Sequence, residues 1–318
     1  MTALQWPYEG AIDPQTLAST KAGSLCVPGF TVADAHGNPM VAQLKIFSDG
    51  NHHMALELVC RRFLEKYPEV KDVFYTTAPA GTVKDAFESG FLRLGNLSVS
   101  VKPNIFLGPQ KLVGPLYEAG IISEPKAFAQ SRGSVLLVKK GNPCNISRAS
   151  DLLQEDVRVA CSNPTKEKAS FGVYSETLRN LIRVECGDEM ADLMLKQLND
   201  SSMCSHSGRI HHREIPQIIA SDVADVAPLY YHLALRYVTI FPDMFEFIPL
   251  GGIVQDPQPG PEHKLNTYFV SSVRENEGTW GEKFVEFMGS REVADIYRGK
   301  GLTSLVLADK EDRDEKKQ

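Results

Sequence analysis

Short apolar segments alternate with amphipathic segments along most of this chain, and this alternation limits the folds that it can adopt. Strand-like segments lie at 41–47, 70–76, 105–108, 134–138, 157–161 and 266–270. Helix-like segments lie at 54–67, 83–90, 112–119, 171–182, 280–288 and 290–298. In the first helix-like segment an apolar face recurs near a period of about 3.6 residues, through Leu56, Val59, Cys60, Phe63 and Leu64. The pattern predicts an α/β fold with a mainly parallel sheet covered by helices.

The size and charge of the chain exclude some classes of protein. Its 318 residues suffice for one large α/β domain or for two lobes around a cleft. A net charge of -6 argues against a broad nucleic-acid-binding surface, which needs clustered Lys and Arg side chains. It does not exclude an anionic ligand, because a local group of backbone N–H donors binds an anion even on an acidic protein. We therefore expect no nucleic-acid partner.

The sequence contains no segment that predicts membrane insertion or export. No apolar run approaches the roughly 18 residues of a membrane helix. Residues 1–7 lack a basic region followed by an apolar one, so they predict no signal peptide. The cysteines are scattered and form no Cys-x-x-Cys motif, which predicts free thiols in a reducing compartment. On these grounds the expected location is cytoplasmic.

Two polar segments in the first half of the chain follow strands and precede helices. Ser48, Asp49 and His52 come after the first strand, and Gly81 and Thr82 come after the second. A helix N-terminus exposes unpaired N–H groups and the positive end of the helix dipole, so these positions suit an anion. The two hydroxyls add donors, and the glycine lets the backbone approach a ligand closely. The alternative is that these side chains only cap their helices.

Similar positions occur in the second half of the chain. Ser170 and Phe171 lie where a long helix is expected to begin, and His212 lies at the expected start of another. Residues 214–231 then read as an amphipathic helix, a polar Ala-Asp turn and an apolar strand that ends at Tyr230. Ser48, Thr82, Ser170 or Phe171, His212 and Tyr230 are far apart in the sequence, and we expect them to converge on one cleft.

The order of these segments resembles that of bacterial solute-binding proteins of the molybdate/tungstate type. The matching residues are the Asn163-Pro164 and Gly172-x-Tyr174 pairs, the Ala224-Asp225 turn and the closing helices that end at Gly301-Leu302. The resemblance covers roughly residues 41–305. It implies an α/β, two-lobe type II periplasmic-binding-protein-like fold with a ligand cleft between the lobes. Such clefts close by hinge motion around the ligand.

The resemblance also implies how the chain is divided. Lobe I is expected at 41–130 and 274–305, and lobe II at 131–273. An N-terminal extension at 1–40 and a charged tail at 306–318 flank the two lobes. The tail is almost wholly charged, which is typical of a solvated or disordered segment.

Carried over residue by residue, the resemblance implies a ligand site made of Ser48, Gly81, Thr82, Ser170 or Phe171, His212 and Tyr230. In that family the ligand is a tetrahedral oxyanion held by neutral donors, and no chemistry is done on it. Asp49 departs from the pattern, because a carboxylate beside an anion is unfavourable unless a proton or a cation intervenes. The Ser170-Phe171 pair stands where the family has Pro-Ala, which leaves open which of the two faces the ligand.

Histidines gather in these segments more than the resemblance predicts. Six of the eight lie in or near the expected ligand loops. His52, His212 and His232 are the candidate metal ligands, with Asp49 as a possible carboxylate ligand. Protonated, the same rings would instead donate to an oxyanion. The third reading is that they are ordinary polar loop residues, since their spacing matches no zinc finger or His-Glu-x-x-His helix.

No catalytic signature is present: the chain has no Gly-x-Ser-x-Gly, Walker-type loop or Gly-x-Gly-x-x-Gly. We therefore expect a binding protein without a cofactor, which holds a small oxyanion such as molybdate or tungstate and partners an ABC transporter permease. One alternative is a cytosolic ligand sensor or divalent-metal-binding module on the same fold. Another is an enzyme on this fold that uses a cleft histidine. A role in transport would place the protein in the periplasm or outside the cell.

Overall fold

The computed structural model describes residues 34–78, 80–94, 97–208 and 210–306. Their contacts form two compact α/β units, and the chain passes from one to the other and back. Lobe I comprises the described residues of 34–130 and 267–306, and lobe II those of 131–266. Apart from residues 34–40 and residue 306, the expected extension and tail lie outside the described residues.

Within the described residues, lobe I is built on a seven-stranded sheet in the order β1-β3-β2-β6-β15-β7-β16. The strands are β1 (Asp34–His36), β2 (Leu44–Asp49), β3 (Val73–Ala78), β6 (Ile105–Pro109), β7 (Lys126–Ser131), β15 (Thr267–Ser272) and β16 (Leu302–Ser304). Strand β2 is parallel to β3 and β6, whereas β15 is antiparallel to β6 and β7. The sheet is therefore mixed. Its parallel strands β2, β3 and β6 are joined by crossover connections that contain helices, as parallel pairing requires.

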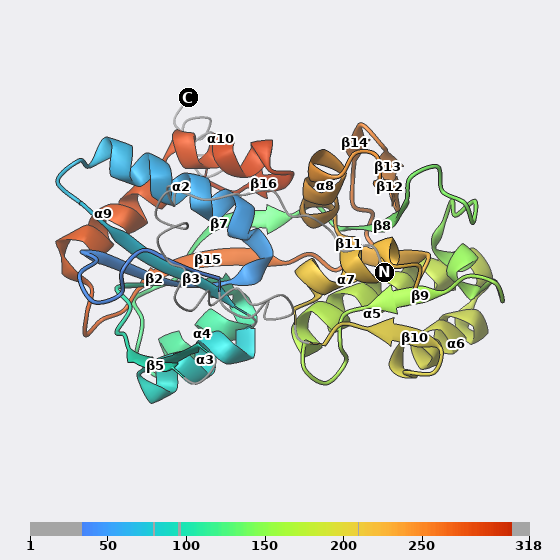
Figure 1. The fold of residues 1–318 in the computed structure, drawn as a ribbon, viewed down its shortest axis with the longest axis horizontal. Helices are drawn as coiled ribbons and strands as arrows, with labels where there is room; N and C mark the ends of the chain where they lie inside the picture. The colour runs from blue at the N-terminus through green and yellow to red at the C-terminus, as the bar shows by residue number, and fades with distance from the viewer. Residues whose placement is uncertain (1–33, 79, 95–96, 209, 307–318) are drawn as a thin grey trace, which may run out of the picture. The chain divides into compact units, whose positions relative to one another are not determined.

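Helices cover both faces of this sheet (Figure 1). One face carries α2 (His53–Lys66), α9 (Gly278–Met288) and α10 (Arg291–Gly299), and the other carries α3 (Ala80–Ser89) and α4 (Gln110–Glu118). Alternate residues of a strand point to opposite faces. Leu44 and Ile46 accordingly join the core beneath α2, while Phe47 joins the core beneath α3 and α4. A hairpin of β4 (Phe91–Leu94) and β5 (Leu97–Ser100) follows α3.

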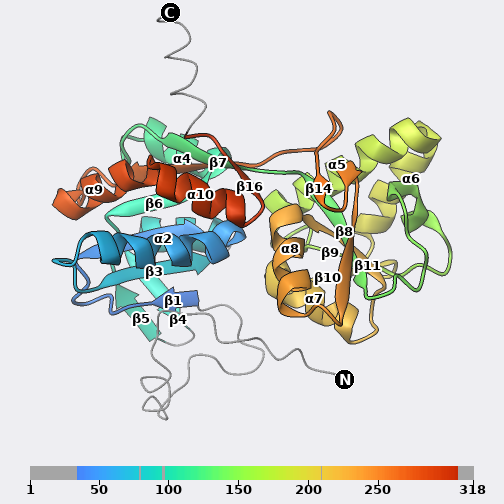
Figure 2. The same ribbon diagram turned by 90° about the horizontal axis from the view of Figure 1, so that it is seen from above.

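The described part of lobe II contains a five-stranded sheet in the order β10-β9-β11-β8-β12. Its strands are β8 (Ser134–Lys139), β9 (Val159–Cys161), β10 (Cys204–His206), β11 (Val226–Tyr230) and β12 (Phe245–Pro249). Its helices are η2 (Ala149–Leu153), α5 (Lys168–Cys186), α6 (Asp188–Asn199), α7 (His211–Ala220) and α8 (Tyr231–Ile240). Strand β9 is parallel to β10 and β11, and β8 is antiparallel to β11 and β12. A short hairpin of β13 (Gly252–Ile253) and β14 (Asp256–Pro257) precedes the return to lobe I (Figure 2).

The chain leaves lobe I between residues 130 and 131 and returns between 266 and 267. The return was expected after residue 273, so the sequence assigned β15 to the other lobe. In the structure Tyr268 and Val270 of β15 are buried in the lobe I core, and β15 pairs with β6 and β7. The expected boundary is corrected for this reason: β15 completes the lobe I sheet and does not close lobe II.

Candidate functional site

The carboxyl ends of two parallel strands meet at one edge of lobe I. In the register of β2 and β3, Ser48 lies opposite Thr77 and Asp49 lies opposite Ala78. Beyond these ends begin the short helix η1 (Gly50–His52), which leads into α2, and helix α3. Ligands of α/β sheets bind at such carboxyl edges. The first two polar segments of the sequence therefore occupy neighbouring positions at an edge of the expected kind.

Asp49 and Ser48 are buried and make local contacts at this edge. Asp49 is the N-cap of η1, and its Oδ1 accepts a hydrogen bond from the Asn51 backbone N at 3.2 Å. The Ser48 hydroxyl donates to the Asp49 carbonyl oxygen at 2.9 Å and lies 3.2 Å from His52 Nε2. Asp49 therefore caps η1, and a role of Asp49 in ligand binding stays a prediction.

His52 is a buried residue of the lobe I core. Its Nδ1 lies 2.9 Å from the Tyr297 hydroxyl of α10, and its ring packs 4.9 Å from the Tyr268 ring centroid. Burial, with smaller effects of the Cys60 thiol and Asp49, raises the pKa of Tyr297 well above its usual value, so the phenol stays protonated. The ring therefore joins Ser48 to α10 and positions the end of β2.

The second lobe I segment is described only through its backbone. Gly81 and Thr82 lie in the first turn of α3, directly after β3. Their side-chain surroundings lie outside what the structure describes. Their expected role in ligand binding stays a prediction.

Lobe II has a corresponding edge. Cys161 at the end of β9 lies opposite His206 at the end of β10, and β11 runs parallel on the other side of β9. The loops that follow these strands carry Glu167 and Ser207, and Tyr230 ends β11. The parallel arrangement therefore gathers these three segments at one edge of the lobe II sheet.

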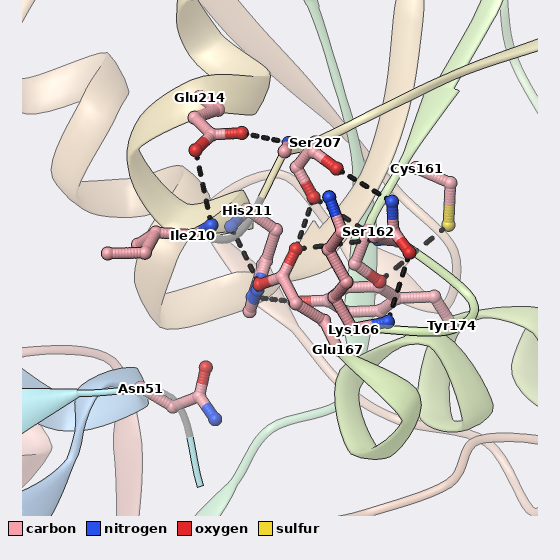
Figure 3. Close-up of polar contacts among 12 residues, drawn as sticks. Asn51, Cys161, Ser162, Lys166, Glu167, Tyr174, Ser207, Ile210, His211 and Glu214 are labelled. Carbon is pink, nitrogen blue, oxygen red and sulfur yellow. Dashed lines mark hydrogen bonds and ion pairs between the residues drawn. The ribbon is translucent and has the colours of Figure 1, made fainter. Parts of the chain in front are cut away.

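A buried carboxylate lies at the centre of this edge (Figure 3). Glu167 Oε1 accepts a hydrogen bond from the His211 backbone N at 2.8 Å and lies 2.8 Å from His211 Nδ1. Its Oε2 accepts from the Ser207 hydroxyl and, at 3.4 Å, from the Asn163 backbone N. Burial alone would raise the pKa of Glu167. The hydrogen bonds and electrostatic attraction of His211, together with the hydrogen bond from the Ser207 hydroxyl, outweigh burial and lower the pKa to about 2. The carboxylate is therefore ionised at neutral pH.

The hydrogen-bond chain continues from His211 to the end of β11. His211 Nε2 lies 3.1 Å from the Tyr174 hydroxyl, and the Tyr230 backbone N donates to the same hydroxyl oxygen at 3.4 Å. The Tyr174 and Tyr230 rings also pack, with centroids 5.0 Å apart. A single chain of contacts thus connects the start of α5, the start of α7 and the end of β11.

A second carboxylate caps the segment before α7. Glu214 Oε2 accepts from the Gly208 backbone N, and its Oε1 accepts from the Ile210 backbone N at 3.3 Å. Together with Glu167 it supplies acceptors for backbone N–H groups that a helix start otherwise leaves unpaired. The backbone donors that the sequence offered to a ligand at this helix are therefore partly used by the chain itself.

The remaining predicted residues of lobe II lie close to this chain of contacts. Ser170 and Phe171 are in the first turn of α5 and are buried. His212 follows His211 in the first turn of α7, with ring centroids 5.5 Å apart. The Tyr230 ring stacks on His232 of α8, with centroids 5.2 Å apart. These predicted residues of lobe II therefore lie near one another, and their role in ligand binding stays a prediction.

Sequence reasoning missed Glu167 and His211. Glu167 stands in the charged run Lys166-Glu167-Lys168, which reads as an exposed loop. His211 is adjacent to His212, the residue that the resemblance implied, and the start of a helix does not reveal which of two neighbouring side chains turns inward. The motif that could have indicated the network is Gly172-x-Tyr174, since Tyr174 accepts from the end of β11.

Two further observations concern metals and membranes. Among residues 34–306 that the structure describes, no group of three or more His, Cys, Asp or Glu side chains is arranged to hold a metal ion. His52 belongs to lobe I, whereas His212 and His232 belong to lobe II. No helix in the described part of the chain has the length and apolar character that crossing a bilayer requires.

The sequence and the structure were compared with known proteins. The family model of the bacterial extracellular solute-binding protein matches residues 44–303. No curated protein matches the sequence. Similar solved structures include L-phospholactate-bound PEB3 of Campylobacter jejuni, at 19% identity and a TM-score of 0.56, covering 82% of this chain and 99% of that one.

Two others are named for inorganic anions. The Azotobacter vinelandii periplasmic molybdate-binding protein is 14% identical, with a TM-score of 0.56 over 82% of this chain and 99% of its own. The sulfate-binding protein SubI of Mycobacterium tuberculosis is also 14% identical, with a TM-score of 0.59 over 84% of this chain and 89% of its own. At these identities the likeness shows the fold, and the expected two-lobe type II periplasmic-binding-protein fold is confirmed.

Proposed function

The chain belongs to the bacterial extracellular solute-binding protein family, and we propose that it binds a small solute carrying an oxyanion, of which molybdate and tungstate are the simplest examples. The observation that carries this proposal is the position of the polar segments. In each lobe they lie together at the carboxyl edge of parallel strands, where helices begin. Helix starts favour negative charge on a ligand.

The similar structures support an anion over other solutes. Those compared above are named for molybdate, sulfate and L-phospholactate, and all three ligands carry oxygen atoms with negative charge. Another similar structure is named for bound iron, at 14% identity and a TM-score of 0.54. A cation is therefore the class of ligand that the test has to exclude.

We propose that donors at each of these edges contribute to solute binding. In lobe I these are Ser48 and the first turn of α3, and in lobe II they are Tyr230 and the first turns of α5 and α7. The family description also supports a place outside the cytoplasmic membrane. A similar structure, named as the substrate-binding domain of a putative molybdenum ABC transporter from Clostridium difficile, supports an ABC transporter permease as partner. Cell fractionation with the protein expressed from its own gene tests the location: recovery only with cytoplasmic markers counts against export.

A thermal-shift screen tests the ligand class directly. A solute that binds only the native protein stabilises it by about 2.7 kcal/mol at 100 times its dissociation constant. Molybdate, tungstate, sulfate, phosphate and phosphorylated carboxylates form the anion panel, with Zn²⁺ and Fe³⁺ as the cations. The proposal expects a saturable rise in melting temperature with at least one anion. A rise with the cations alone would favour a metal-binding protein.

A further inference from the structure

The start of α7 is filled by the chain's own carboxylate. Glu167 accepts from the His211 backbone N and contacts His211 Nδ1, both at 2.8 Å, and it also accepts from Ser207 and Asn163. Each carboxylate oxygen accepts about two hydrogen bonds, so these contacts use most of the capacity of the group. A bound oxyanion at a helix start would make contacts of the same kind.

We propose that Glu167 is a built-in anion, which occupies the anion-binding position at the start of α7 and positions the lobe II part of the solute site before any solute arrives. The inference rests on the proposed function for its second half, the solute site. Its first half concerns lobe II alone. Glu167 is a positioning residue in this account, because it acts through His211 and Tyr174.

The direction of the hydrogen bonds shows how this positioning works. An ionised carboxylate only accepts, so Nδ1 of His211 carries a proton toward Glu167. In the neutral ring Nε2 is then an acceptor, and the Tyr174 hydroxyl donates to it across 3.1 Å. The hydroxyl oxygen in turn accepts from the Tyr230 backbone N. Glu167 thus sets the tautomer of His211 and, through it, the orientation of Tyr174 at the end of β11.

A consequence follows for the solute. The backbone N–H groups of Gly208 and Ile210 are paired with Glu214, and that of His211 is paired with Glu167. The anionic group of the solute is therefore held by other donors of the site, and it does not take the place of Glu167 at these three amides. The resemblance implied His212 at the start of α7, and the His212 backbone N–H is not one of these three amides.

Glu167→Gly together with formate tests the built-in anion. The substitution removes the carboxylate, and formate supplies one of the same shape. Formate should restore at least half of the melting temperature that the variant loses, while an equal concentration of chloride does not. Wild type and Glu155→Gly, which removes an exposed carboxylate, serve as controls and should show no such gain. If formate and chloride act alike on the variant, the built-in anion is refuted.

Glu167→Gln tests the positioning role of Glu167. It is the second variant, for use if Glu167→Gly does not fold. Ring ¹⁵N NMR of His211 should show a proton on Nδ1 in wild type and a changed tautomer population in Glu167→Gln. Affinity for the molybdate or sulfate probe should fall by about tenfold, which corresponds to about 1.4 kcal/mol. An unchanged His211 signal, or unchanged affinity for an anion that wild type binds, overturns the positioning role.

The outcomes separate this inference from the proposed function. If no anion in the panel binds wild type, the proposed function and the positioning of a solute site both fail, whereas formate rescue still decides the built-in anion. If wild type and Glu167→Gln bind the probe equally, the proposed function stands and Glu167 has no part in it.

Discussion

Replacing Glu167 with glutamine should remove a pH-dependent contribution to the stability of lobe II. Glutamine resembles the protonated carboxyl group in shape but cannot ionise. The pKa of Glu167 is about 2 in the folded protein, against an ordinary value of 4.5. The ionised form is therefore favoured by folding, and a difference of about 2.5 pKa units corresponds to about 3 kcal/mol. The side chain is 4% exposed, so solvent screening reduces this value little.

The sign of the effect follows from the lowered pKa. Stabilisation by the ionised group is fully present above about pH 4.5, and it is lost as the pH falls through about 2. The variant should thus be about 3 kcal/mol less stable than wild type at neutral pH, and the two should approach each other near pH 2. Leaving a buried hydrogen-bonding group without its partner costs a similar amount, about 1 to 3 kcal/mol.

Urea unfolding followed by circular dichroism at several pH values between neutrality and pH 2 measures this difference. Comparing variant with wild type cancels the other carboxylates of lowered pKa, such as Asp151 and Asp225, which both proteins share. Glu214→Gln is the matched control, because it changes a carboxylate at the same helix and leaves Glu167 in place. A constant difference between wild type and Glu167→Gln over this pH range would refute the reasoning.

Three further changes have expected outcomes. Ser290→Ala removes the side-chain oxygen that accepts from the Val293 backbone N at 3.3 Å, and it should lower unfolding free energy by about 1 kcal/mol in urea melts; no change would show that this cap contributes nothing. Burial lowers the pKa of His263 from 6.5, so the unfolded chain binds its proton more readily and stability should decrease as the pH falls below about 6.5. His263→Gln should remove that part of the pH dependence, and an unaltered slope would contradict it. Cys186 is exposed and should react with a thiol reagent in the native protein. Cys161 is buried and its pKa is raised well above its usual value, so it should react only after unfolding. Equal reaction rates of the two thiols in the native protein, measured by mass spectrometry, would contradict this.

The sequence predicted the fold well where periodicity is strong. The helix expected at 54–67 is α2, with its apolar residues in the lobe I core, and the strand expected at 134–138 is β8. The resemblance to molybdate-type solute-binding proteins is confirmed at the level of the family and fold. Antiparallel β15 was placed in the wrong lobe because the apolar pattern of a strand does not show which sheet the strand joins.

The site was harder to predict than the fold. Parallel strand ends can be recognised from the sequence, and Ser48 and Tyr230 lie at such ends. Buried polar networks leave no periodic signal, so Glu167 reads as one charge in an exposed loop although it is buried. His52 shows a second difference, since a histidine expected in a polar loop is packed among core aromatic rings. Side-chain direction at a strand end depends on tertiary packing, which a single sequence does not show.

The most direct test of the account is calorimetric titration of molybdate and sulfate into wild type, Ser48→Ala and Tyr230→Phe. Ser202→Ala and Tyr117→Phe are matched controls at exposed positions. The account predicts saturable binding of at least one anion to wild type and both controls. Affinity should fall by about 10- to 150-fold in each edge variant, since a lost hydrogen bond to a charged group costs about 1.5 to 3 kcal/mol. Binding that is equally strong in wild type and both edge variants, or no binding of either anion to wild type, would contradict the claim that the two strand edges hold an oxyanion.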